Sequence, residues 1–164
     1  MRYFLIIVTI LSMNAAAEIS SISSDVRCVP ETDDCAATLY IKSRETVKTI
    51  NDLVGPFYLS KANNQVFDCG GNVLRRSHQA NIFEEDGSRK VIQHDGGIVD
   101  CGITKDSMYY WLAYERATEG KWYSEFFLFN KLGKAIYNTT SKFDSTVQFK
   151  YNGKKYSVYI PPIP

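Results

Sequence analysis

Short apolar and aromatic runs alternate with polar turns along most of this chain. Each unit of the pattern has an apolar pair, a polar turn with a glycine and a second apolar pair, as in residues 66–74, 82–92, 127–137 and 149–159. Two of these turns contain Asp86-Gly87 and Asn152-Gly153, dipeptides that favour tight β-hairpin turns. The pattern predicts a mainly β chain, an antiparallel meander arranged as a barrel, a sandwich or blade-like sheets.

One segment has instead the spacing of an amphipathic helix. Apolar residues fall on one helical face at positions 47, 50, 53 and 54. Ser43 is a suitable N-cap, and Gly55-Pro56 provides a stop signal. We therefore expect one short helix near residues 44–54 that packs on a face of the sheet.

The first 17 residues have the parts of a secretory signal peptide. Arg2 precedes an apolar run over residues 3–11, and Ala15-Ala16-Ala17 forms a small-residue cleavage site. The run is shorter than the roughly 20 residues that a membrane-spanning helix needs, which argues against the alternative of a membrane anchor. We expect cleavage after Ala17 and a single periplasmic or secreted domain over residues 18–164, with no membrane anchor.

All four cysteines lie within that domain, at positions 28, 35, 69 and 101. An even number in an exported chain predicts two disulfides, for which three pairings are possible. We favour Cys28–Cys35, because the pair is local. We favour Cys69–Cys101 because both cysteines follow an apolar pair and an Asp and precede a Gly. That bond would close a loop of about 30 residues and contribute roughly 3–4 kcal/mol in the chain-entropy model.

Charge and ligand patterns exclude several classes of function. Without Arg2 the chain has 18 basic and 18 acidic residues, a balance that argues against a nucleic-acid-binding protein. Residues 121–164 hold 7 bases and 2 acids, which we interpret as lysines that protect sheet edges in preference to a basic binding face. There is no C-x-x-C, and His78 and His94 do not have zinc-motif spacing to the cysteines. We expect no metal and no cofactor.

Catalytic patterns are also missing from the sequence. The chain has neither a G-x-S-x-G nor an H-E-x-x-H motif, and its cysteines are expected to be oxidised. Glu84, Glu85 and Asp86 supply neighbouring carboxylates and His94 a possible base, but a solvated turn and a surface histidine explain them as well. We expect no enzymatic activity, and a small secreted hydrolase is the third hypothesis.

Aromatic residues are the first candidates for contact with a partner. Of 22 Phe, Tyr and Trp residues, several stand in two near-continuous aromatic runs that flank a polar turn over residues 118–121. Strand alternation places some of them on each face, and outward Tyr and Trp give rigid contact area. The predicted partner-binding residues are Tyr109, Trp111, Trp122 and Tyr123. The alternative is a sheet that is covered on both faces.

The second candidate contact is the loop His94-Asp95-Gly96-Gly97. It combines a histidine, an acid and two flexible glycines close to Cys101. A short loop of this kind can insert into the cleft of an enzyme, although a plain tight turn needs no function. We predict that His94, Asp95, Gly96 and Gly97 contact the partner.

One group of motifs falls within about residues 57–100: Tyr58-Leu59, Cys69-Gly70-Gly71, the segment Phe83 to Val91 and the turn with His94. Over these residues the chain resembles periplasmic immunity proteins that pair with peptidoglycan-amidase effectors of type VI secretion. The resemblance implies a non-enzymatic protein that plugs the catalytic cleft of the effector with a loop, by position His94–Gly97. The aromatic half beyond Tyr109 departs from the family.

Together these features predict an exported, protein-binding inhibitor. Its most concrete form is an immunity protein that occludes the active site of a cell-wall-degrading effector such as a peptidoglycan amidase. The alternative is a lysozyme inhibitor or another secreted β-rich binding protein.

Overall fold

The computed structural model describes residues 17–28, 35–44, 46–71, 79–94 and 97–162. Of the expected signal peptide it describes only Ala17, and His78 also lies outside the described residues. In the described part, no helix is long and apolar enough to cross a membrane.

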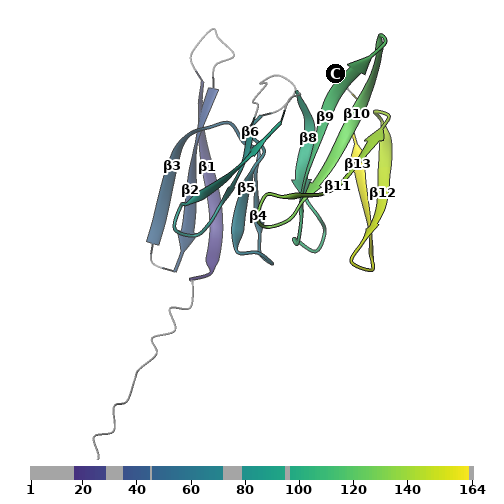
Figure 1. The fold of residues 1–164 in the computed structure, drawn as a ribbon. Coiled ribbons are helices and arrows are strands. Elements are labelled where there is room, and N and C mark those ends of the chain that lie inside the picture. Colours follow the sequence, from purple (N-terminus) through teal and green to yellow (C-terminus); the bar gives the residue numbers. More distant parts are fainter. Residues whose placement is uncertain (1–16, 29–34, 45, 72–78, 95–96, 163–164) are drawn as a thin grey trace, which may run out of the picture.

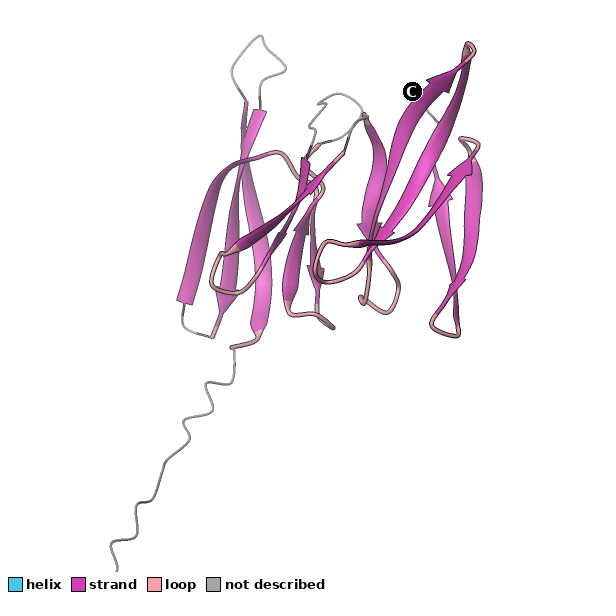
Figure 2. Cartoon of the chain, viewed as in Figure 1, coloured by secondary structure: helices cyan, strands magenta, loops and turns pink. Residues whose placement is uncertain are grey.

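Thirteen strands form the described structure, and every pairing between them is antiparallel (Figure 2). The strands are β1 (Ile19–Cys28), β2 (Cys35–Ser43), β3 (Thr46–Leu53), β4 (Phe57–Ser60), β5 (Gln65–Asp68), β6 (Gln79–Phe83), β7 (Arg89–Gln93), β8 (Ile98–Ile103), β9 (Tyr110–Thr118), β10 (Lys121–Phe129), β11 (Ala135–Ser141), β12 (Ser145–Tyr151) and β13 (Lys154–Ile160).

Strands that follow one another in the sequence form four sheets. We call them the first sheet (β1-β2-β3), the second sheet (β4-β5-β6-β7), the third sheet (β11-β10-β9-β8) and the cap (β12-β13). They follow one another in space as in the sequence, and none closes into a barrel (Figure 1). The predicted antiparallel β architecture is confirmed, and the barrel alternative is wrong for the described residues.

The predicted helix near residues 44–54 is wrong, because this segment forms strand β3. Four of the eight residues of β3 are β-branched, and such side chains favour a strand over a helix. β3 pairs with β2 along its length, with Ile50 opposite Leu39. Val47 belonged to the expected apolar stripe, yet it is exposed in β3. The spacing of apolar residues was therefore compatible with a helix, but the segment forms a strand.

Three apolar clusters hold the sheets together, one between each pair of neighbours. Leu39 and Ile41 of the first sheet meet Val66 and Phe83 of the second. The opposite face of the second sheet, which includes Phe67, packs against the third sheet. The cap covers most of the other face of the third sheet. The two middle sheets are thus largely buried on both faces, which accounts for their near-continuous apolar runs.

The disulfides join the pairs that the sequence favoured. Cys28 and Cys35 connect the ends of β1 and β2, where they are direct partners in the register. Cys69 follows β5 and bonds to Cys101 in β8, with the two Cα atoms 6.1 Å apart. The second bond therefore ties the second sheet covalently to the third. Two disulfides are compatible with an oxidising, exported compartment.

Candidate functional site

The hairpin of β9 and β10 extends beyond its neighbours in the third sheet. These strands pair from Tyr110↔Phe129 to Thr118↔Lys121. The register of β8 on β9 stops at Tyr114, and that of β11 on β10 stops at Ser124. Residues 116–123 therefore form a two-stranded projection, which we call the arm (Figure 1). At about 3.3 Å per residue, each strand of the arm extends roughly 10 Å.

The end of the arm is a tight two-residue turn. Glu119 and Gly120 have φ angles of 52° and 73°, the left-handed values that a type I′ hairpin turn requires. Its twist matches the right-handed twist of the flanking strands, so the arm continues the hairpin without distortion. The segment Thr118-Glu119-Gly120-Lys121 thus forms the hairpin turn at the end of the arm.

An ion pair stabilises the base of the arm. Arg116 Nε lies 2.9 Å from Glu125 Oε2, and both side chains are about one quarter to one third exposed, at 31% and 25%. A pair of this exposure contributes roughly 0.2–1 kcal/mol. Its larger effect is geometric, since it links the two strands where the support of β8 and β11 ends.

Alternation along β10 places the two aromatic residues of the arm on opposite faces. Trp122 lies on the face of Ser124 and Phe126, which is the face toward the cap. Its cross-strand partner is Ala117, which is too small to cover the indole. Trp122 consequently remains 60% exposed, unusual for so large an aromatic side chain.

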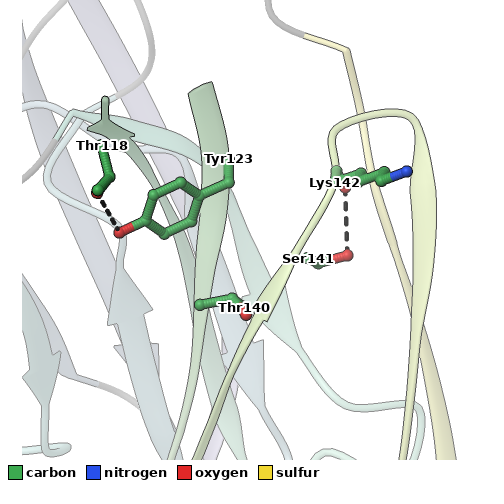
Figure 3. A pocket seen from close by; sticks show the side chains of 5 residues that line it. All are labelled: Thr118, Tyr123, Thr140, Ser141 and Lys142. Carbon is green, nitrogen blue, oxygen red and sulfur yellow. Dashed lines mark hydrogen bonds between the residues drawn. The ribbon is translucent and has the colours of Figure 1, made fainter. Parts of the chain in front are cut away.

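Tyr123 lies on the other face of the arm and is half-buried. Its hydroxyl is 3.3 Å from that of Thr118 across the hairpin. Figure 3 shows these two side chains pointing toward each other beside a hollow of about 500 Å³. The hollow is lined by Thr118, Tyr123, Thr140, Ser141 and Lys142. Hydroxyls and one amine make it suitable for polar side chains of a partner.

Two of the predicted contact aromatics belong to the core. Tyr109 and Trp111 are 9% and 8% exposed and lie in the cluster between the third sheet and the cap. Tyr109 packs edge-on against Tyr151, with ring centroids 5.3 Å apart. The burial of Tyr109 and Trp111 leaves little of either ring for the rigid contact area that we expected, while Trp122 and Tyr123 are accessible. The sequence spacing could not distinguish Tyr109 and Trp111 from Trp122 and Tyr123, because the position of the cap decides which part of the third sheet is covered.

The predicted loop at residues 94–97 does not present its histidine. His94 is 6% exposed, and its ring stacks on Tyr114 with centroids 4.9 Å apart, so the predicted insertion of His94 into a cleft is corrected. Asp95 and Gly96 lie outside the described residues. The carbonyl of Gly97 accepts a hydrogen bond from the Glu115 N–H at 2.9 Å, beside the base of the arm. This loop therefore supports the arm through its described residues.

The carboxylates considered for catalysis are bonded to neighbouring residues. Glu84 forms an ion pair with Lys90, and Glu85 accepts a hydrogen bond from the Ser43 hydroxyl at 3.0 Å. Hydrogen bonds from the Ser88 side chain and from the Ser88 N–H lower the pKa of Asp86. Among the described residues, no three His, Cys, Asp or Glu side chains converge on a possible metal position.

Sequence reasoning missed one buried acid. Asp68 is 1% exposed, and its carboxylate accepts hydrogen bonds from the N–H groups of Gly55 and Gly70, each at 3.0 Å. Asn81 Nδ2 donates to the second oxygen at 2.8 Å. Burial raises the pKa of Asp68 although these donors oppose the shift. The carboxylate organises the chain next to Cys69, a structural role.

Comparison with known proteins shows a likeness of fold. No family model matches this chain, and no curated protein matches it. Among solved structures it is similar to the acylaminoacyl peptidase of Pyrococcus horikoshii, with a TM-score of 0.58 and 11% sequence identity. The alignment covers 88% of this chain but 32% of the peptidase chain, so this protein spans about a third of that length. At this identity the likeness concerns the arrangement of sheets alone.

Proposed function

We propose that this is an exported protein that binds another protein through the arm. The observation that carries the proposal is Trp122, a large aromatic side chain 60% exposed on a two-stranded projection. Exposed Trp and Tyr residues are enriched among the few interface residues that supply most of the binding energy. Trp122 and Tyr123 lie on opposite faces of the arm, so a cleft that closes around the arm would contact both.

In its more specific form, the proposal is an immunity protein against a cell-wall-degrading effector, most concretely a peptidoglycan amidase. The resemblance over residues 57–100 suggests this class, and the two disulfides are compatible with the periplasm in which such an effector acts. Inhibition would be steric. The arm takes the role expected of residues 94–97, because it projects whereas His94 is buried.

A non-enzymatic role is part of this proposal. Glu84, Glu85 and Asp86 are engaged with neighbouring residues, which supports a structural turn over a pair of catalytic carboxylates. The similarity to a peptidase does not bear on this, because it concerns the fold.

The test combines binding and inhibition. The purified protein is titrated into peptidoglycan-amidase effectors, with complex formation followed by calorimetry and hydrolysis followed by release of cell-wall fragments. Lysozyme in a parallel turbidity assay separates the two inhibitor hypotheses. We expect a complex with an amidase and loss of its hydrolysis.

Two matched variants locate the contact. Trp122→Ala should weaken the complex by about 2 kcal/mol or more, roughly thirtyfold in Kd, as expected for an interface hot spot. Leu132→Ala removes an equally exposed apolar side chain (64%) from the β10–β11 turn and should change the Kd less than about threefold. The proposal would be refuted if the protein bound none of the amidases and lysozymes tested, or if the protein alone hydrolysed the cell wall.

A further inference from the structure

The cap leaves part of the third sheet uncovered. Among the described residues, β12 and β13 pair only with each other, whereas the third sheet below them has four strands. Phe149 of β12 packs on Phe126 of β10 and on Tyr137 of β11, with ring centroids 5.6 and 5.1 Å apart. Tyr156 of β13 contacts Tyr109, the residue before β9. The cap therefore covers the β11, β10 and β9 side of the sheet and ends before β8.

A groove of about 440 Å³ occupies the place beside β13 where a further cap strand would lie. Its lining consists of Ile103, Thr104 and Lys105 at the end of β8, Trp111 of β9, and residues 155–159 of β13. We call this the β13 groove. The Trp111 indole lies across Gly102 of β8, 3.0 Å from where a Cβ on that glycine would stand. The glycine thus lets the ring lie flat as part of the lining.

The edge of β13 suits an extended chain. A strand at the end of a sheet presents backbone N–H and C=O groups that a further strand can pair with. Strand addition supplies main-chain hydrogen bonds, while alternate side chains enter pockets on the receiving surface. A two-stranded sheet also gains stability from a third strand. Here the groove would receive the inward side chains of the added strand.

The charge of the cap indicates the chemistry of that strand. Residues 145–160 contain three lysines and no acid, and Lys105 adds a further amine to the groove. Lys150 and Lys155 are direct cross-strand partners, an arrangement that costs stability because like charges face each other. Lys154 is already paired, with its Nζ 3.0 Å from Asp106 Oδ2. Lysines at an edge repel a second basic strand, as expected from the sequence, whereas an acidic strand would compensate the remaining amines.

We propose that the β13 groove binds an extended acidic segment of another protein, which adds to the cap as a third strand. A second copy of this chain is disfavoured as the occupant, because pairing β13 with β13 would place two sets of three lysines in one sheet. This surface is separate from the arm, and its test does not depend on the proposed inhibitor function.

The test uses a synthetic seven-residue peptide, the length of β13, that alternates glutamate with valine or threonine. One control peptide replaces each glutamate with lysine. The other keeps the glutamates and carries a central proline, which cannot complete the ladder of hydrogen bonds. Binding is measured by fluorescence anisotropy at low and high salt, and amide hydrogen exchange identifies the protected strand. We expect only the acidic peptide without proline to bind, more weakly at high salt, and to slow exchange in β13.

Matched charge reversals test the site. Lys155→Glu should weaken binding of the acidic peptide about tenfold, since it replaces an attraction with a repulsion. The same change should leave the protein as stable or more stable, because the new carboxylate would face Lys150. Lys48→Glu on exposed β3 makes the identical charge change far along the chain and should alter the Kd less than about twofold. Trp122→Ala should bind the peptide normally, which separates this site from the arm.

Several results would overturn the proposal. Equal binding of the proline peptide would show attraction by charge without strand addition. If millimolar acidic peptide neither bound nor slowed amide exchange in β13, the groove would not be a site for acidic extended segments. A loss in Lys48→Glu as large as in Lys155→Glu would show that the peptide responds to net charge and not to β13.

Discussion

The two disulfides should contribute unequally to stability, and the difference can be worked out from the loops they close. Cys69–Cys101 spans 32 positions and Cys28–Cys35 spans 7. The chain-entropy relation then gives about 3.7 kcal/mol for the long loop and about 2.4 kcal/mol for the short one at 25 °C. Replacing the long-loop pair by alanine should therefore cost more, and Cys69 and Cys101 are also buried, so their removal adds a loss of packing.

The position of each bond in the fold increases this difference. Cys69–Cys101 joins the second sheet to the third, whereas Cys28–Cys35 joins two strands that are already paired. The double variant Cys69→Ala/Cys101→Ala is compared with Cys28→Ala/Cys35→Ala as its matched control. The measurement is urea unfolding of each, together with the melting temperature. For a chain of this length, a loss of about 3.7 kcal/mol corresponds to a fall in Tm of roughly 7–15 °C.

Equal losses in the two double variants would refute the reasoning. A smaller loss for the Cys69/Cys101 variant than for the Cys28/Cys35 variant would show that residual structure in the unfolded chain already restricts the long loop. An unchanged urea slope is needed for the comparison, because the slope reports the surface exposed on unfolding.

Two further predictions concern the buried and bonded polar groups. Partial burial acts to raise the pKa of Asp106, but hydrogen bonds from Thr104, Lys154, Tyr156 and a backbone N–H outweigh it and lower the pKa to about 2. A lowered carboxyl pKa contributes stability above the ordinary value of 3.8 that is lost as the pH falls toward 2. In urea unfolding, Asp106→Asn should thus lower the free energy of unfolding by about 1 kcal/mol at about pH 6, after solvent screening, and by almost nothing at about pH 2. A loss that is the same at both pH values would contradict this. Tyr110→Phe should lower the free energy of unfolding by about 1–3 kcal/mol in the same assay. The reason is that the buried hydroxyl donates to Gln65 Oε1 at 2.7 Å, and its loss leaves that oxygen unpaired. The control is Tyr159→Phe, which removes an exposed hydroxyl and should cost far less.

The aromatic half of the chain shows where sequence patterns are ambiguous. Tyr109, Trp111 and Trp122 have similar neighbours in the sequence, yet the first two are core residues and the third is exposed. The difference arises because β12 and β13 fold back over the part of the third sheet that holds Tyr109 and Trp111. Trp122 lies beyond the supported part of the hairpin, so nothing among the described residues covers it to the same degree.

The segment 46–53 shows the same ambiguity in local structure. Apolar residues at a spacing of three also occur in a strand when only some of them need burial, and in β3 only Leu53 is buried. A decisive signal was present in the β-branched content, which the apolar spacing obscured. His94 is a parallel case, since its position beside a Gly-Gly turn indicates a surface loop until Tyr114 is seen to stack on it.

The order of residues alone predicted the antiparallel β architecture and the two hairpin turns, and it favoured the cysteine pairing that the structure shows without excluding the other two. These features depend on near neighbours in the chain, on backbone preferences at turns and on matching local contexts, all of which are visible in a linear sequence. The arrangement in space was needed to establish which aromatic residues remain exposed and that the arm projects whereas His94 is buried. It was also needed to show that no other described strand pairs with the outer edge of β13. Each of these depends on how far one strand extends past another and on what lies above it, and residues distant in the sequence settle both.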